Sequence, residues 1–325
     1  MQLVQRFYPV IEKYLIENSF SRDPQALYDP VNYILKLGGK RLRPVLVLAA
    51  CDLFGTDYHK ALSAALSVEI FHNFSLVHDD IMDDAPLRRG KPTVHERYNT
   101  NTAILSGDVM VILAYEYLCK TEDKTVIPRI LDIFNETAIK VCEGQQYDMD
   151  FETSNDISIP DYLKMIELKT AALLVGSLGI GAVIGGASAA DFYGICEFGR
   201  NIGIAFQLQD DFLDTFGDAQ KVGKQPGGDI IQNKKTWLIL KALEIAPPDL
   251  KKTLQKWMEN VEGDDQLKVR EVTQIFNTLN IPHLMVEAMK RYKEEALVHL
   301  EKISGSGSSK QGLEELADLI IVRDY

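Results

Sequence analysis

Two clusters of aspartates with the same D-D-x-x-D spacing are the most distinctive feature of the sequence. Residues 79–83 and residues 210–214 carry this pattern, each where a long apolar run ends. On a helix, residues four apart lie on one face, so the first and last carboxylates of each cluster repel one another unless something compensates them. Mg²⁺ is one such compensation, because it is typically held by one or two carboxylates together with substrate phosphates. The carboxylates belong to Asp79, Asp80, Asp83, Asp210, Asp211 and Asp214.

The two clusters therefore predict a site for a diphosphate. Two helices that each present carboxylates could clamp a diphosphate through shared metal ions, which would neutralise the charge that builds on it as it departs. The ordinary alternative is a solvated acidic helix end. The second cluster argues against that alternative, because Phe206, Leu208 and Phe212 surround its aspartates in the sequence.

Basic residues accompany both clusters. Residues 37–44 read L-G-G-K-R-L-R-P and supply three cations at a predicted helix start, where Pro44 suits the first turn. Glycine lets a backbone approach phosphate closely, and arginine offers phosphate bidentate hydrogen bonds. Residues 87–92 form a basic turn after the first cluster, and four lysines between residues 221 and 235 follow the second. A surface charge is the commoner role of any one of them, but their repeated placement favours a diphosphate site.

Helical periodicity dominates the elements that must position these residues. Apolar residues recur at three- and four-residue intervals, whereas alternating strand patterns are nearly absent. No stretch resembles an interdomain linker, so we expect one all-α domain over residues 1–325. The periodic segments are Val45–Phe54, Ala61–Val77, Thr102–Lys120, Val126–Cys142, Tyr162–Gly186, Ala190–Leu213 and Thr236–Ile245.

The composition argues against several classes of function. A net charge of −12 argues against nucleic acid as a partner, although metal ions can still make an acidic site attract anions. The four cysteines lie far apart, and the first residues lack a signal-peptide pattern, so we expect a cytoplasmic protein with reduced thiols. Residues 171–190 carry no charge over the length of a membrane span, but thirteen of them are Ala, Gly or Ser. That composition favours a closely packed core helix over a membrane-spanning one.

Together these residues resemble the trans-isoprenyl diphosphate synthase (polyprenyl synthetase) family. The resemblance runs from about Gly38 to Thr236, and the helical tail is compatible with it. It implies the isoprenoid synthase fold, a single domain of long helices around a central hydrophobic cavity. It also implies a short-chain prenyltransferase of the geranylgeranyl or farnesyl diphosphate synthase type. Such an enzyme joins isopentenyl diphosphate to dimethylallyl, geranyl or farnesyl diphosphate, and a homodimer formed through helices such as Thr102–Lys120 is expected.

The resemblance assigns roles to individual positions. Three Mg²⁺ ions per active site would be held by Asp79, Asp83 and Asp210. All six cluster aspartates would take part in catalysis, together with Arg88, Lys169, Thr170 and Gln207. Isopentenyl diphosphate would be bound by Gly39, Lys40, Arg43, His72 and Arg89. The allylic diphosphate would be bound by Arg88, Lys169, Thr170, Gln207, Lys224 and Lys234, with Gly144, Gln145 and Asp148 lining the same site. Three- and four-residue steps place four residues on one stripe of the helix: His72, Ser75, Asp79 and Asp83.

The implied reaction is ionisation, condensation and elimination. Metal ions and cations draw diphosphate from the allylic substrate, the double bond of isopentenyl diphosphate attacks the resulting cation, and a proton is then lost. Electrostatic stabilisation carries the first step and enforced proximity the second. No side-chain nucleophile is required, and the sequence offers no convincing Ser/His/Asp or Cys/His set.

Product length depends on the helix that leads into Asp79. Ser75, one turn before it, would let a hydrocarbon tail pass, whereas Phe74 and Phe71 either close the floor of the pocket or are ordinary core aromatics. Each five-carbon unit adds about 5 Å, comparable to one helical turn, so this depth suits a C15 or C20 product. Within the family, an aromatic residue five positions before a motif without an insertion favours C20.

Other interpretations remain open at this point. A longer-chain polyprenyl diphosphate synthase would use the same motifs. A terpene cyclase would lack the complete second cluster with its lysines, and a non-catalytic subunit of a heteromeric prenyltransferase would have lost aspartates. A helical scaffold would bear the clusters on its surface. One departure from the family pattern is Asn233, which stands where a glycine usually precedes the lysine.

Overall fold

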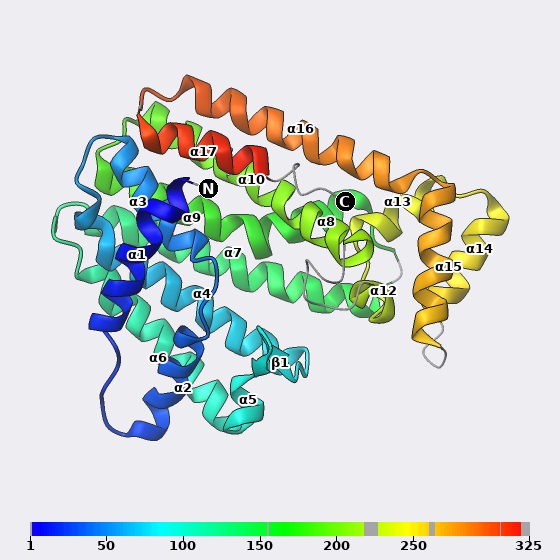
Figure 1. The fold of residues 1–325 in the computed structure, drawn as a ribbon, viewed down its shortest axis with the longest axis horizontal. Coiled ribbons are helices and arrows are strands. Elements are labelled where there is room, and N and C mark those ends of the chain that lie inside the picture. Colours follow the sequence, from blue (N-terminus) through cyan, green and yellow to red (C-terminus); the bar gives the residue numbers. More distant parts are fainter. Residues whose placement is uncertain (1, 155, 218–226, 260–263, 306, 320–325) are drawn as a thin grey trace. The chain divides into compact units, whose positions relative to one another are not determined.

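The structure, a computed structural model, describes residues 2–154, 156–217, 227–259, 264–305 and 307–319. Over these ranges nearly all regular structure is helical (Figure 1). The strands found there form one antiparallel hairpin of two-residue strands, β1 (Leu87–Arg88) and β2 (Lys91–Pro92). The predicted all-α class is therefore confirmed. The hairpin is an addition to the prediction, because strands of two residues produce no alternating pattern.

The chain divides into two compact units. The first comprises Met1–Glu136, Gly176–Cys196 and Ile303–Glu315. The second comprises Thr137–Val175, Glu197–Lys302 and Leu316–Tyr325. Four helices contribute residues to both units: α7 (Ile127–Thr153), α9 (Ala172–Gly185), α10 (Ala189–Phe216) and α17 (Ser308–Leu319).

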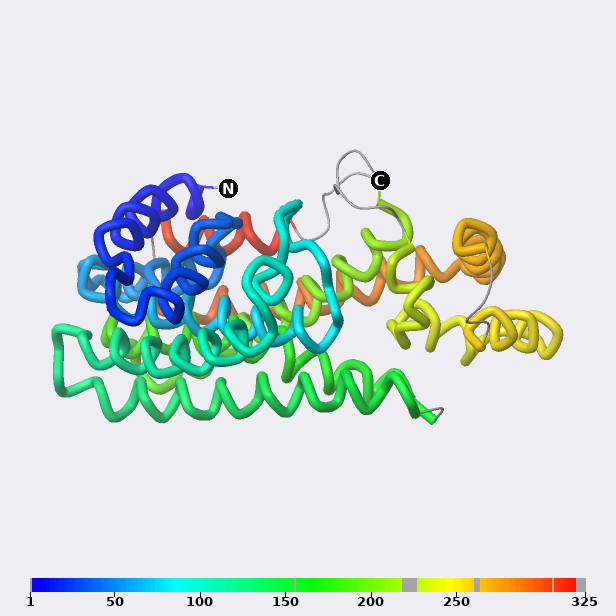
Figure 2. The backbone as a smooth tube through the Cα atoms, turned by 90° about the horizontal axis from the view of Figure 1, so that it is seen from below, coloured from blue at the N-terminus to red at the C-terminus, as the bar shows by residue number. Residues whose placement is uncertain are grey.

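The first unit is built on two buried helices, α3 and α4. Its other helices are α1 (Gln2–Glu17), α2 (Gln25–Lys36), η1 (Tyr58–Ala61), α5 (Val94–Arg97) and α6 (Thr100–Cys119), while α3 spans Leu42–Leu53 and α4 spans Leu62–Met82. Residues 44–51 of α3 are all buried, as expected of a helix that is apolar on every side. Helix α4 packs along α6, whereas α1 packs on α3 and α2 on α6; α1 and α2 are dark blue in Figure 2.

Close helix packing in the first unit uses glycines of α9. A β-carbon at Gly181 would lie 2.2 Å from the Val47 carbonyl oxygen of α3, and one at Gly185 would lie 2.9 Å from the Cys51 carbonyl oxygen. Only a residue without a side chain allows backbones to approach this closely. The small residues of this segment therefore serve helix packing, as their composition predicts.

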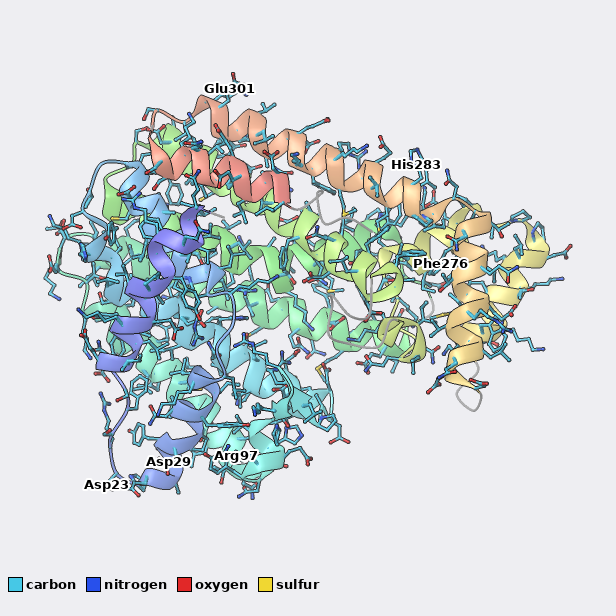
Figure 3. The ribbon with its side chains drawn as sticks, in the orientation of Figure 1. Asp23, Asp29, Arg97, Phe276, His283 and Glu301 are labelled. Carbon is cyan, nitrogen blue, oxygen red and sulfur yellow. The ribbon has the colours of Figure 1, made fainter. Side chains whose placement is uncertain are left out.

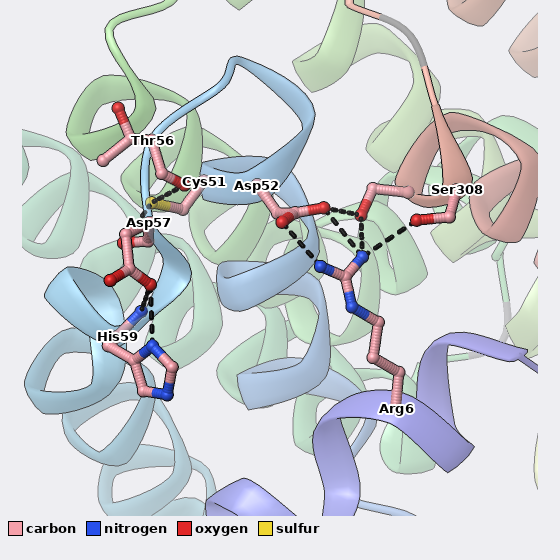
Figure 4. Close-up of polar contacts among 8 residues, drawn as sticks. Arg6, Cys51, Asp52, Thr56, Asp57, His59 and Ser308 are labelled. Carbon is pink, nitrogen blue, oxygen red and sulfur yellow. Dashed lines mark hydrogen bonds and ion pairs between the residues drawn. The ribbon is translucent and has the colours of Figure 1, made fainter.

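A polar contact ties α1 to the C-terminal part of the first unit. Arg6 of α1 binds Asp52 of α3 through two hydrogen bonds of 2.8 and 2.7 Å, and it also donates to Ser308 of α17 at 3.0 Å (Figure 4). Ser309 donates to the same carboxylate at 2.6 Å. This contact holds the end of α3, far along that helix from its N-terminus.

The second unit packs its remaining helices around a separate apolar core. They are α8 (Ile159–Ile166), the π-helical turn η2 (Glu167–Ala171), α12 (Gly228–Ile231), α13 (Trp237–Ile245), α14 (Pro248–Glu259), α15 (Asp265–Thr278) and α16 (Ile281–Lys302). Phe276 of α15, labelled in Figure 3, is completely buried and belongs to this core together with Trp237 and Phe212. Helix α8 begins with a capping box, in which Ser158 and Asp161 exchange side-chain to backbone hydrogen bonds.

Two described helical segments are long and apolar enough to cross a membrane by length and composition alone. They are Thr100–Cys119 and Ile159–Gly185, the second being the continuous run of α8, η2 and α9. The buried share of the most apolar window is 44% in Thr100–Cys119 and 78% in Ile159–Gly185. The larger share is typical of a helix in the core of a protein. The burial of α9 thus agrees with its interpretation as a packed helix.

Candidate active site

The first aspartate cluster lies at the C-terminal end of α4. Asp79 and Asp80 belong to its last turn, and Asp83 caps the helix with its N–H donating to the Asp79 carbonyl at 2.9 Å. Asp83 is exposed and Asp79 is half-buried, whereas Asp80 is completely buried. The motif therefore divides into two accessible carboxylates and one that is enclosed by protein.

The enclosed carboxylate of Asp80 binds Arg88. The Nε of Arg88 lies 2.7 and 2.8 Å from the two carboxylate oxygens, and its Nη2 lies 2.6 Å from Oδ1. Burial raises the pKa of Asp80, and the nearby Arg88 opposes that rise. Arg88 sits in β1 just before a turn whose central residues, Arg89 and Gly90, both have positive φ, as tight hairpins require. Asp80 thus fixes Arg88 beside Asp79, whose Oδ2 lies 3.7 Å from Nη2.

Residues predicted to bind isopentenyl diphosphate gather at the start of α3. Arg43 Nη1 lies 3.0 Å from His72 Nε2. Burial and then the positive charge of Arg43 hold the pKa of His72 well below its ordinary value of 6.5, so the imidazole is neutral. A β-carbon at Gly39 would lie 2.6 Å from Arg89 Nη2, which means that this guanidinium rests against the glycine backbone. Lys40 follows and is exposed.

Arg41 does not belong to this basic set, although the sequence counts it among three cations at the helix start. Only 3% of the residue is exposed, and it donates to Glu69 at 2.6 Å and to Glu12 at 2.7 Å. Its backbone is left-handed, with φ of 47°, and its side chain points into the first unit. The accessible cations of this segment are therefore Lys40 and Arg43.

The predicted length-determining residues lie one to two turns before the first cluster. Phe71 is buried, and its ring centroid is 5.3 Å from that of Phe74 and 5.3 Å from that of Phe134 on α7. Phe74 is half-buried and also contacts the ring of His78. Ser75 donates its hydroxyl to the His72 carbonyl at 2.8 Å. Phe71 thus has the burial of a core aromatic, and Phe74 is the more accessible ring.

In the second unit, the second cluster occupies the end of α10. Asp210 is exposed and Asp211 is buried. Tyr162 of α8 donates its hydroxyl to Asp211, and Gln207 donates Nε2 to the other carboxylate oxygen at 3.0 Å. Thr170 donates to Gln207 Oε1 at 2.8 Å. Burial raises the pKa of Asp211 well above its ordinary range. Three predicted residues, Thr170, Gln207 and Asp211, therefore form one hydrogen-bonded chain.

The third aspartate of this cluster holds the segment around α12. Asp214 accepts a hydrogen bond from the Asp229 N–H at 2.9 Å, and Lys234 Nζ lies 3.9 Å from the Asp229 carboxylate. Asn233, the departure from the usual glycine, has φ of 57°, a conformation that asparagine tolerates better than most residues. Lys224, the other lysine predicted to hold the allylic diphosphate, lies outside the described residues, as does Lys221.

Lys235 differs from its neighbour Lys234. Its Nζ donates to the carbonyls of Phe151 at 2.7 Å and Glu152 at 3.2 Å, and also to that of Ser154. A lysine in this position satisfies the last carbonyls of α7 and interacts favourably with the helix dipole. Burial lowers its pKa. Lys235 therefore stabilises the end of α7 and is not one of the accessible cations.

Lys169 and Thr170 lie in the π-helical turn η2, directly before the glycine-rich helix α9. Lys169 Nζ lies 2.5 Å from Asp148 Oδ2 of α7. A β-carbon at Gly144 would lie 2.2 Å from the Lys169 nitrogen, and one at Gly203 of α10 would lie 2.4 Å from the Ala171 β-carbon. Two glycines thus let α7 and α10 approach η2, and π-turns of this kind are frequent at functional sites.

The carboxylates fit magnesium as the donor set of a substrate-bound ion. The described residues contain no group of three or more His, Cys, Asp and Glu side chains that could hold a metal by themselves. Magnesium does not need such a group, because it keeps waters and takes ligands from substrate phosphates. Accessible carboxylates a turn apart at the end of α4, with Asp80 withdrawn to bind Arg88, suit that mode of binding.

Three residues that organise the site were missed at the level of sequence. Glu69 and Glu12 bind Arg41, and Tyr162 binds Asp211. A signal for Glu69 was present, because an acidic residue in the middle of the apolar run at residues 61–77 is unusual unless it is paired. Tyr162 and Glu12 gave no comparable signal, since neither stands out from its surroundings in the sequence.

Comparisons with known proteins find relatives over nearly the whole chain. Residues 24–278 match the model of the polyprenyl synthetase family. Over 314 residues the chain is 38% identical to the geranylgeranyl diphosphate synthase of Sulfolobus acidocaldarius, covering 95% of this chain and 94% of that one. A crystal structure of a geranylgeranyl pyrophosphate synthase superposes with a TM-score of 0.94 at 41% identity over 99% of both chains. A polyprenyl synthase from Caulobacter crescentus CB15, complexed with calcium and isoprenyl diphosphate, superposes with a TM-score of 0.88 at 27% identity, over 99% of this chain and 96% of that one.

Proposed function

The chain belongs to the polyprenyl synthetase family, and we propose that it joins isopentenyl diphosphate to an allylic diphosphate to make a C20 diphosphate. It is a prenyltransferase of the geranylgeranyl diphosphate synthase type with the isoprenoid synthase fold. The observation that carries the proposal is the end of α4, where accessible Asp79 and Asp83 lie beside an arginine fixed by Asp80. A diphosphate bound through metal ions needs both kinds of group.

Divalent metal ions, which this family uses to bind diphosphate, are proposed to be held by Asp79, Asp83 and Asp210. We propose three ions per active site. When bound, they supply positive charge that stabilises the departing diphosphate. Asp211 has a different part in this proposal: bound to Tyr162 and Gln207, it orders the end of α10.

The allylic diphosphate is proposed to contact Arg88, Lys169, Thr170, Gln207, Lys224 and Lys234. Arg88 suits this role because its ion pair with Asp80 restrains its orientation, which reduces the entropy lost when it binds. The ammonium of Lys169 is held by Asp148, and the hydroxyl of Thr170 is oriented by Gln207. Groups held in this way stabilise developing charge without reorganising during the reaction.

Isopentenyl diphosphate is proposed to bind at Gly39, Lys40, Arg43, His72 and Arg89. Because arginine can only donate hydrogen bonds, the Arg43 contact makes Nε2 of the neutral His72 an acceptor and leaves its proton on Nδ1. His72 can then donate from Nδ1, while Arg43 and Lys40 supply charge. The side chains bring the double bond to the allylic cation by orientation, and the final proton leaves with the diphosphate in this proposal.

The C20 product length is proposed from the position and burial of Phe74. This ring lies five residues before Asp79 and is half-buried, with the buried ring of Phe71 behind it. A tail that passes Ser75 would meet Phe74, and within the family an aromatic residue five positions before a motif without an insertion favours C20. The geranylgeranyl synthases similar to this chain support the same length.

We further propose a cytoplasmic homodimer with one polyprenyl synthetase domain over residues 1–325. The family match at residues 24–278 includes parts of both compact units, which supports a single domain. Helix α6 exposes Ile104, Leu105 and Ile112, with Ile112 66% exposed. A row of large apolar side chains at helical spacing is expected to be covered by a partner, and a second copy of α6 supplies the same row.

The reaction assay tests this proposal directly. Purified protein is incubated with Mg²⁺, isopentenyl diphosphate and each allylic primer of five, ten or fifteen carbons, and the dephosphorylated products are sized. We expect a discrete C20 product, and its loss in Asp79→Ala and with a chelator. A ladder of products beyond C30 would refute the short-chain assignment, and no condensation with any primer would refute the prenyltransferase function.

A further inference from the structure

A buried ion pair lies beneath the segment that carries Gly39, Lys40 and Arg43. Arg41 Nη1 donates to Glu69 Oε1 at 2.6 Å, and the side chains are 1% and 2% exposed. Asn73, one turn after Glu69 on α4, donates to the same oxygen at 2.9 Å and is completely buried. Burial alone would lower the pKa of Arg41, but Glu69 and Glu12 more than offset it, so its pKa is raised and it stays charged.

Arg41 connects four helices at one point. It is the residue before the first turn of α3, and its carbonyl accepts the Val45 N–H at 3.1 Å. Its guanidinium binds Glu12 of α1, Glu69 of α4 and, at 2.5 Å, the Leu35 carbonyl near the end of α2. Because the guanidinium donates hydrogen bonds to three different helices, it fixes the position of the start of α3 relative to α1, α2 and α4.

The backbone around Arg41 has an unusual conformation that the buried ion pair stabilises. Gly38, Gly39 and Arg41 have φ of 78°, 127° and 47°, so three of four consecutive residues adopt left-handed conformations. A left-handed conformation is unfavourable for a residue that has a side chain, so the surrounding structure must stabilise it. The ion pair with Glu69 stabilises it in Arg41, and with Arg41 turned inward, Lys40 is exposed.

Helix α4 therefore has two neighbouring polar stripes. One is buried and consists of Glu69, Asn73 and Asp80, and it holds Arg41 and Arg88. The other is half-buried and runs from His72 through Ser75 to Asp79. Because His72 contacts Arg43, this half-buried stripe and the start of α3 depend on the same relative position of α3 and α4.

We propose that Glu69 and Arg41 are positioning residues for the isopentenyl diphosphate subsite, fixing Lys40 and Arg43 against His72 through the buried ion pair at the start of α3. Neither residue touches substrate in this proposal. The inference rests on the proposed function, because it assumes that this segment binds isopentenyl diphosphate. It predicts that damage to the pair is felt by this substrate and not by the allylic one, whose arginine, Arg88, is held by a different carboxylate.

The test compares the two substrates in Glu69→Gln, which keeps the size of the side chain and removes its charge. We expect the KM for isopentenyl diphosphate to rise at least tenfold, with the KM for the allylic substrate and kcat within twofold of wild type. Asp52→Asn is the matched control, since it weakens an ion pair at the other end of α3 and should leave both KM values unchanged. Equal rises in both KM values would reveal a general structural defect and overturn the proposal.

A second variant and a binding measurement cover the remaining outcomes. If Glu69→Gln does not fold, Asn73→Ala takes its place as the test variant. It removes one hydrogen bond to Glu69 and should raise the KM for isopentenyl diphosphate by a smaller factor. An unchanged KM in Asn73→Ala would overturn the proposal. Calorimetric titration with isopentenyl diphosphate alone, which cannot react without a primer, separates this inference from the proposed function. Equal affinity in wild type and Glu69→Gln overturns the inference even where turnover is normal, whereas absent turnover in wild type refutes the function.

Discussion

Replacing Gly144 by alanine is expected to destabilise the second unit substantially. The new β-carbon would lie 2.2 Å from the Lys169 nitrogen and 2.6 Å from its α-carbon, whereas ordinary van der Waals contact begins at 3.4 Å. The obstacle is backbone, so no change of rotamer relieves it, and α7 must move away from η2 by roughly 1 Å. Overpacking of this kind costs about 3 kcal/mol or more when backbone shifts are forced. Alanine recovers about 1 kcal/mol of helix propensity, which leaves a net loss of about 2 kcal/mol or more.

Urea denaturation followed by circular dichroism measures this loss, and Gly179→Ala is the matched control. Gly179 also lies inside a helix, so the propensity gain is the same, but its nearest neighbours are the ring of Phe192 at 3.3 Å and the Cys196 sulfur at 3.5 Å. These side chains can yield, and we expect a free energy of unfolding within about 1 kcal/mol of wild type. Gly144→Ala should also raise the KM for the allylic substrate, because Lys169 moves. If the two variants unfold at the same urea concentration, the close approach of α7 to η2 is refuted.

Other predictions concern the ion pair of the first cluster, the neutral histidine and the two adjacent lysines. Asp80→Ala should lower the free energy of unfolding by about 3 kcal/mol. This is the lower end of the range for a broken buried ion pair, because a quarter of the Arg88 side chain is exposed. A loss of less than about 1 kcal/mol, measured by urea denaturation, would contradict this prediction. The pKa of His72 is lower in the folded protein than in the unfolded chain, so only the unfolded chain binds a proton near pH 6.5. The contribution of neutral His72 to stability is therefore complete above pH 6.5 and is lost as the pH falls below that value. His72→Gln should flatten this part of the profile of urea midpoint against pH, and an unchanged profile would refute the assignment. Lys235→Met should lower the unfolding temperature with little effect on KM, whereas Lys234→Met should raise the KM for the allylic substrate with little effect on stability; the reverse pattern would exchange their roles.

The sequence predicts the fold class and the chemical character of the site because both depend on local spacing. Apolar residues at three- and four-residue intervals predict α4 and α10, and the D-D-x-x-D spacing places Asp79 and Asp83 on one face of a helix. Resemblance to known family motifs adds roles for Lys169 and Thr170. These features are short-range in the chain, and the all-helical structure confirms the elements that they predict.

The rest depends on contacts between residues far apart in the chain. Lys234 and Lys235 are equivalent in the sequence, yet only Lys235 reaches the carbonyls at the end of α7, more than 80 residues earlier. The family motif separates Lys40 from Arg41, but the reason that Arg41 is withdrawn appears only with its partner Glu69 and its left-handed backbone. A cluster of charged residues thus indicates the chemistry of a region. Tertiary packing decides which of those residues belong to the site.

The two polar stripes of α4 limit how this helix can change by insertion or deletion. Each residue of a helix advances by about 100° and about 1.5 Å. One residue inserted between Asn73 and Asp79 would rotate the end of the helix by about 100° against Glu69, turning Asp80 out and a substrate-facing carboxylate in. Four inserted residues would nearly restore the angle but carry Asp79 about 6 Å further along the axis. Between Asn73 and Asp80, divergence in this helix is therefore confined to substitutions, and changes of length are compatible with both stripes only after Asp80.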